Sequence, residues 1–165
     1  MNIGTQGPFP GFEPKQRSGL LLHAMLASTV GFLSGFIWIM AIHGGLQFWP
    51  LPAITFDVPP SRDLLDNAHT GPIMNALFVM AVAALSSYVD LSRLQWRIAF
   101  YASVLMLWGN TIGYQAAVFA PNRGMQPEGG ITNVISYFCF YFAIGGLVVT
   151  LILAIWGAIR AMRKS

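Results

Sequence analysis

The sequence predicts an all-α integral membrane protein, folded as a bundle of four transmembrane helices. Of its 165 residues, 55% are hydrophobic and only 9% are charged, whereas a soluble domain carries about 25% charged residues. The apolar residues also fall into four continuous runs, each near the roughly 20 residues with which a helix crosses a bilayer. A β-barrel would instead show short alternating segments. Helices therefore account best for both observations.

The four predicted spans cover residues 19–44, 70–88, 98–119 and 131–159. The first is long enough to remain in the membrane, and the proline-containing segment before it does not resemble a cleaved signal peptide. The connections after the first and third spans are rich in proline and glycine, as in Pro50-Leu51-Pro52 and Pro121-Asn122-Arg123-Gly124, so we expect ordered caps there. Because no internal repeat is visible, residues 1–165 are expected to form a single membrane domain.

Basic residues flank the spans unevenly. If the spans alternate in direction, most basic residues lie on one side: Lys15, Arg17, Arg93, Arg97, Arg160, Arg163 and Lys164. The other side receives Arg62 and Arg123. The positive-inside rule then places both termini in the cytoplasm, in a membrane of the bacterial inner (cytoplasmic) type. The formal charge of +3 therefore indicates topology rather than a nucleic-acid partner, since no basic stripe with interleaved aromatic residues is present.

The single cysteine, Cys139, lies inside an apolar run. One cysteine allows no internal disulfide, no thiolate metal cluster and no covalent haem attachment. Any haem would therefore be held without thioether links.

Polar side chains occupy the outer edge of the second span, in the stretch Asn67-Ala68-His69-Thr70-Gly71-Pro72-Ile73-Met74-Asn75. Such residues at the edge of the bilayer core are usually functional. His69 is the leading metal-ligand candidate, because a neutral imidazole is a good axial ligand for haem iron. The alternative is an interfacial histidine that bonds a loop carbonyl, and the residues alone leave both open.

Asn75 and Tyr114 are placed at a similar depth to His69, near the outer interface. Asn75 follows His69 by about 9 Å along a helix and about 120° around it, so both residues can serve one haem most easily if neighbouring subunits share the site. Otherwise Asn75 makes an interhelical hydrogen bond. Tyr114 follows the small, polar run Trp108-Gly109-Asn110-Thr111-Ile112-Gly113. Its phenol either donates to a substrate oxygen or packs between helices.

Two further histidines lie near the ends of the first span. His23 and His43 are separated by roughly 30 Å if the span is one helix, so they cannot ligate the same iron. We expect both to be helix-end residues that reach the interface. His43 and His69 could instead lie at similar depth and bind one haem together, which would suit an electron carrier.

Taken together, these motifs resemble the styrene oxide isomerase family. The likeness is carried by Ala68-His69-Thr70-Gly71-Pro72 with Asn75, by Trp108-Gly109-Asn110 with Tyr114, and by Pro121-Asn122-Arg123-Gly124. Length, the four spans and the motif order agree over most of the chain. The amino-terminal tail and the first span match least.

The resemblance implies a homotrimeric membrane enzyme with haem b between adjacent subunits, which isomerises aryl epoxides such as styrene oxide to aldehydes such as phenylacetaldehyde. By motif, His69 would be the axial haem ligand, and Asn75 and Tyr114 would hold and orient the epoxide oxygen. Ferric iron would act as a Lewis acid, and a 1,2-hydride shift would complete this Meinwald rearrangement. Small aryl epoxides partition into lipid, so a pocket reached from the bilayer can collect them.

Three functions therefore remain to be compared with the structure. The favoured one is the haem-dependent epoxide isomerase. The second is a b-type cytochrome that carries electrons, with His43 and His69 as paired ligands. The third is a haem-free four-span scaffold or small transporter.

Overall fold

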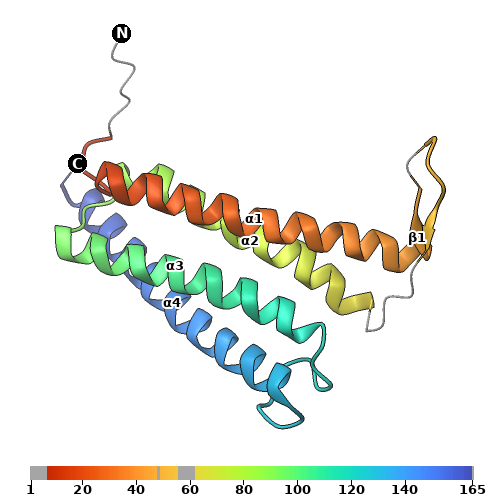
Figure 1. Ribbon diagram of the computed structural model, residues 1–165. Helices are drawn as coiled ribbons and strands as arrows, with labels where there is room; N and C mark the ends of the chain where they lie inside the picture. The colour runs from red at the N-terminus through yellow and green to blue at the C-terminus, as the bar shows by residue number, and fades with distance from the viewer. Residues whose placement is uncertain (1–6, 48, 56–61, 165) are drawn as a thin grey trace.

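The structure is a computed structural model that describes residues 7–47, 49–55 and 62–164. In chain order its elements are α1 (Pro14–His43), β1 (Gly45–Leu46), β2 (Ile54–Thr55), α2 (Arg62–Leu85), the short 3-10 helix η1 (Ser86–Tyr88), α3 (Arg93–Ala117) and α4 (Ile131–Met162). The four long helices lie side by side (Figure 1), which confirms the predicted all-α class. The predicted cap between the first two spans falls partly, at residues 48 and 56–61, outside the described residues.

Three of the described helical segments are long and apolar enough to cross a membrane: α1, the segment Leu64–Tyr88, which covers most of α2 together with η1, and α4. This supports a membrane protein. The remaining helix, α3, is more polar, and it contacts α1, α2 and α4. A helix with neighbours on several sides can carry polar side chains because those neighbours provide hydrogen-bond partners. The predicted span 98–119 corresponds to α3, which is not among the helices long and apolar enough to cross a membrane, so three of the four predicted spans are supported.

The bundle consists of two closely packed pairs, α1 with α2 and α3 with α4. Small residues make up most of the buried positions of α1, including Ala24, Ala27, Gly31 and Gly35. Small side chains allow helix backbones to approach closely, which is how membrane helices gain packing energy without a hydrophobic driving force. In the second pair, hydroxyl groups add bonds, as between Ser103 and Thr150 at 3.3 Å. The site described below includes the close contact between α1 and α2 at Gly31 and Gly35.

The second predicted span starts too late in the sequence. Helix α2 begins at Arg62, not at residue 70, because acidic residues are tolerated near the amino-terminal end of a helix and a charged residue such as Asp66 does not by itself indicate a loop. His69 consequently lies in the second turn or later of α2 rather than at the start of the helix. Pro72 also lies inside the helix and not in its first turn.

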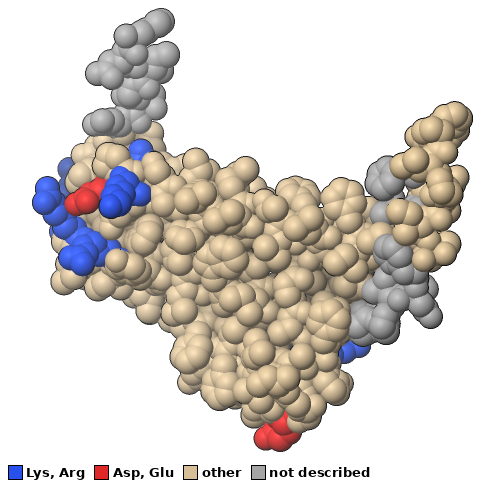
Figure 2. Space-filling view, in the orientation of Figure 1, with Lys and Arg blue, Asp and Glu red and all other residues tan. Residues whose placement is uncertain are grey.

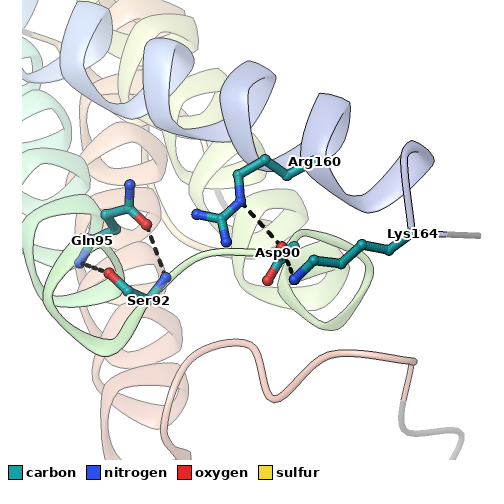
Figure 3. Close-up of polar contacts among 5 residues, drawn as sticks. All are labelled: Asp90, Ser92, Gln95, Arg160 and Lys164. Atoms are coloured by element: carbon teal, nitrogen blue, oxygen red, sulfur yellow. Dashed lines mark hydrogen bonds and ion pairs between the residues drawn. The ribbon is translucent and has the colours of Figure 1, made fainter.

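The other boundaries shift less. Helix α1 begins at Pro14, a favourable first position for proline, and α4 ends at Met162. Helix α3 begins at Arg93, before the predicted residue 98, because Ser92 and Gln95 form a capping box (Figure 3). The backbone N–H of Ser92 donates to Gln95 Oε1 at 2.9 Å, and the backbone N–H of Gln95 donates to Ser92 Oγ at 3.4 Å.

Lysine and arginine side chains gather at the end of the bundle where α1 and α3 begin and α4 ends (Figure 2). This confirms the predicted sidedness of the basic residues. Asp90, between η1 and α3, accepts from Lys164 Nζ at 2.7 Å and from Arg160 Nε at 3.2 Å (Figure 3). The hydrogen bond from Lys164 lowers the pKa of Asp90, partial burial opposes this effect, and the charge of Arg160 adds to it. The ion pairs fasten the end of α4 to the turn between α2 and α3.

We expect Asp90→Asn to lower the thermal midpoint of the protein in detergent at about pH 7 by a few degrees, because exposed ion pairs are individually weak. Since the folded-state pKa of Asp90 lies below its ordinary value of 3.8, this stabilisation is present above about pH 4 and is lost as the pH falls through the lowered pKa. Melting curves of both proteins from neutral to acidic pH should therefore converge. Glu128→Gln, at the opposite end of the bundle, is the control and should leave the midpoint unchanged. An Asp90→Asn deficit that persists at low pH would contradict the assignment.

Candidate active site

The imidazole of His69 is fixed by the backbone of α1. Its Nδ1 lies 3.0 Å from the carbonyl oxygen of Gly31. A carbonyl only accepts, so Nδ1 carries the proton and donates it, and the lone pair of Nε2 is left free. Metal-ligating histidines are commonly held in this way, with the second nitrogen bonded to a carbonyl or carboxylate. The half-buried ring of His69 is therefore in the tautomer that a metal requires.

Two glycines of α1 make room for this ring. A Cβ on Gly35 would lie 2.5 Å from Nδ1 of His69, and a Cβ on Gly31 would lie 2.8 Å from the His69 carbonyl oxygen. Trp38 stacks on the ring, with centroids 5.9 Å apart and planes inclined by 23°, and Phe32 lies 6.4 Å away. The roles of Gly31 and Gly35 were missed in the sequence, although their four-residue spacing is a known signal for close helix packing.

His23 has the opposite tautomer. Its Nδ1 accepts from Nε1 of Trp108 at 3.1 Å. An indole only donates, so Nδ1 of His23 is unprotonated and Nε2 carries the proton. The expectation that His23 is a helix-end residue is therefore wrong, because His23 is the tenth residue of α1 and its ring contacts α3. The sequence could not indicate this partner, which lies on a distant segment of the chain.

His43 ends α1 and is exposed, beside the turn into β1. It follows Gly35, against which His69 packs, by eight residues, or about 12 Å along the helix axis. Within one chain, the described structure therefore does not place His43 and His69 where both could bind the same iron. This geometry does not support the paired-histidine arrangement.

Tyr114 lies against the opposite side of α2. Its ring packs so closely on the backbone of Gly71 that no side chain could replace the glycine hydrogen. The edge of the ring also meets Phe140 of α4, with centroids 5.0 Å apart. Asn75 follows Gly71 by one helical turn and so shares its face of α2. In the part of the chain that the structure describes, neither the Tyr114 hydroxyl nor the Asn75 carboxamide has a hydrogen-bond partner, so both donors are free to bind a ligand.

Helix α2 therefore separates the three predicted site residues. The ring of His69 faces α1. Tyr114, on α3, packs against the opposite face of α2 at Gly71, and Asn75 is on that same face of α2. The contact of Tyr114 with Gly71, two residues after His69, agrees with the predicted similarity in depth. Within one chain, His69 and Tyr114 therefore contact different neighbours on two sides of α2.

A fourth polar residue, Gln115, was missed by the sequence analysis. Its Nε2 donates to the carbonyl oxygen of Ala68 at 2.9 Å, and its Oε1 accepts from Ser34 Oγ at 2.9 Å. Gln115 directly follows Tyr114, and Ala68 directly precedes His69. A glutamine inside an apolar span was the available signal, since such a group needs internal partners.

The described residues contain no group of three or more His, Cys, Asp or Glu side chains that could enclose a metal ion. A bare catalytic zinc ion commonly has about three protein ligands, whereas haem iron needs as few as one axial side chain. The single imidazole with a free Nε2 therefore fits haem better than it fits a bare ion.

Comparison with known proteins agrees with the resemblance predicted from the motifs. The sequence model of the styrene oxide isomerase family matches residues 16–159, which includes nearly all of the four long helices. The styrene-oxide isomerase of Pseudomonas fluorescens is 31% identical over 114 residues, which is 69% of this chain. The match spans 65% of the length of that curated relative. On the extent of the family match, the chain belongs to the styrene oxide isomerase family.

Proposed function

We propose that the protein isomerises aryl epoxides such as styrene oxide to aldehydes such as phenylacetaldehyde, with haem b bound through His69. The observation that carries the proposal is the bond from Nδ1 of His69 to the Gly31 carbonyl, which leaves Nε2 as a ligand. Family membership supports the reaction class. Ferric haem, when bound, supplies a Lewis acid that draws electron density from the epoxide oxygen.

The residues of the chain orient the substrate and stabilise the charge that develops on its oxygen. The Tyr114 hydroxyl and the Asn75 carboxamide donate hydrogen bonds to that oxygen, and such bonds are strongest in a dry site. The benzylic C–O bond breaks, a hydride moves to the benzylic carbon from its neighbour, and the neighbour becomes the aldehyde carbonyl. No atom is gained or lost, so neither water nor a catalytic base is required. Apolar neighbours such as Phe140 exclude water, which would give a diol.

We further propose that the enzyme is a homotrimer in which His69 of one subunit and Tyr114 and Asn75 of the next serve the same haem. The position of these residues on two sides of α2 supports a shared site. The four long helices would all span a bacterial inner membrane. The concentration of basic residues at the end where α1 begins and α4 ends (Figure 2) supports a cytoplasmic location for that end.

The direct test supplies styrene oxide to the purified protein in detergent under oxidising and reducing conditions, while its visible spectrum is recorded. We expect a Soret band and phenylacetaldehyde formation that requires ferric haem, because ferrous iron is a weaker Lewis acid. Haem-loaded protein that converts none of several aryl epoxides would refute the isomerase proposal. Purified protein without a Soret band would favour a haem-free scaffold.

The test also separates isomerisation from hydrolysis. Asp66 is half-buried and lies about one helical turn before His69 on α2, so it is the carboxylate that lies nearest to His69 in the sequence and the first candidate for a nucleophile. Asp66→Asn should keep aldehyde formation. Diol as the main product, lost in Asp66→Asn, would indicate an epoxide hydrolase instead.

Haem retention should depend on His69 and on the space beside it. His69→Ala removes the ligand, and Gly35→Val places a side chain where the ring lies, so both should yield protein with a strongly reduced haem-to-protein ratio in the Soret band. His43→Ala is the matched control and should keep its haem, because His43 lies at the exposed end of α1. Haem loss in His43→Ala, with a six-coordinate low-spin spectrum in the wild type, would favour the paired-histidine cytochrome.

Tyr114→Phe keeps the ring that packs on Gly71 and Phe140 and removes only the hydroxyl. We expect turnover to fall by roughly 100-fold, the usual cost of one donor to a developing oxyanion, while the Soret band stays. Co-expression of Tyr114→Phe with His69→Ala should restore part of the activity, because mixed trimers contain sites with both intact residues. If Tyr114→Phe lost as much haem as His69→Ala, the role of the tyrosine would be structural rather than catalytic. Absence of complementation in verified mixed oligomers would refute the shared site.

A further inference from the structure

We propose that Gln115 is a positioning residue of the active site, which sets the relative placement of His69 and Tyr114 by tying α3 to both α1 and α2. This inference deepens the proposed function and rests on it for its catalytic readout. The structural basis of the inference is independent of haem and substrate. It is a backbone hydrogen bond that is missing from α2.

The defect is the missing backbone N–H of Pro72. In a continuous helix the N–H of residue 72 would donate to the carbonyl of residue 68, four positions earlier, and proline cannot do so. Ala68 is 0% exposed, so its carbonyl cannot turn to water. Nε2 of Gln115 donates to this carbonyl at 2.9 Å. The glutamine therefore replaces the hydrogen bond that proline removes from the helix.

The chemistry of the partners also determines how the Gln115 amide is turned. The Ala68 carbonyl only accepts, so the amide nitrogen must face it. The amide oxygen must then face Ser34 Oγ, 2.9 Å away, and the serine hydroxyl must donate to it. Ser34 also lies 3.0 Å from the Val30 carbonyl, but its single proton goes to Gln115. Both ends of the amide are thus used, one on α1 and one on α2.

Each bonded group adjoins a residue of the site. Ser34 precedes Gly35, against which the His69 ring rests; Ala68 precedes His69; and Gln115 follows Tyr114. The amide therefore links the backbone segments that carry the haem ligand, its support and the substrate donor. Nothing places Gln115 itself on the reacting atoms, so its effect is exerted through these neighbours.

The test is a double-mutant cycle with Gln115→Met and Pro72→Ala, measured by thermal midpoint, Soret spectrum, kcat and KM. Gln115→Met keeps the length of the side chain but leaves the Ala68 carbonyl without a donor. We expect a lower midpoint and a kcat reduced by on the order of tenfold or more, with a smaller change in KM. In the Pro72→Ala background the restored backbone N–H can donate to the Ala68 carbonyl. Gln115→Met should therefore lower the thermal midpoint by clearly fewer degrees there than in the wild-type background.

Two further variants separate positioning from general stability. Gln115→Glu is nearly isosteric: when ionised, its carboxylate presents only acceptors to the Ala68 carbonyl, whereas when protonated, its hydroxyl can donate to that carbonyl. Its kcat and midpoint should therefore fall below those of the wild type as the pH is raised and the carboxyl ionises. Thr150→Val removes a comparable interhelical bond, that to Ser103 at 3.3 Å, away from the site. It should lower the midpoint while kcat is retained.

Three results would overturn the inference. The first is an equal effect of Gln115→Met on the midpoint in the wild-type and Pro72→Ala backgrounds. The second is a Gln115→Glu protein whose kcat and midpoint match those of the wild type at every pH up to alkaline values. The third is the same loss of kcat per degree of midpoint in Gln115→Met and Thr150→Val. Failure of the proposed function gives a different pattern. In that case the wild type forms no aldehyde, while the coupling between Pro72 and Gln115 in the thermal midpoint is still observed.

Discussion

The contact between the His69 imidazole and the backbone of α1 is the interaction on which the arrangement of the candidate site depends. A membrane interior offers no water to polar groups, so each group must find an internal partner. The Gly31 carbonyl provides that partner only because α1 carries no side chain at Gly31 or Gly35. Close packing of α1 on α2 and the chemical state of the histidine are therefore consequences of the same two glycines.

The same principle assigns different chemistry to histidines on neighbouring helices. The partner of His69 is a pure acceptor, whereas the partner of His23 is a pure donor. Each partner selects one tautomer, and the two tautomers present opposite groups at Nε2. His69 offers a lone pair there, and His23 offers a proton. The residue type made both histidines candidates, but the hydrogen-bond partner makes one of them suitable as a neutral ligand.

Polar groups in the half of the bundle away from the basic residues are linked through neighbouring helices rather than isolated. Pro72 interrupts α2 near the histidine, and Gln115 of α3 completes the interrupted hydrogen bond. A break in a helix is tolerated inside a bundle when a neighbouring helix satisfies the freed carbonyl. The Tyr114 hydroxyl and the Asn75 carboxamide have no hydrogen-bond partner within the described chain, whereas Gln115, beside Tyr114, uses both ends of its amide. Unused donors beside a rigid framework are what a ligand-binding site requires.

The sequence by itself determined the helical class, the approximate spans, the side that carries the basic residues and the candidate residues His69, Asn75 and Tyr114. These features depend on composition, on local periodicity and on motifs, which are all written along the chain. The start of α2 was misjudged because acidic residues in a first helical turn resemble a loop in a hydropathy pattern. The tautomers of His23 and His69, the bridge made by Gln115 and the separation of His69 from Tyr114 were decided only by the tertiary structure. Each depends on which partner a distant helix presents, and a single sequence does not encode that pairing in any local pattern.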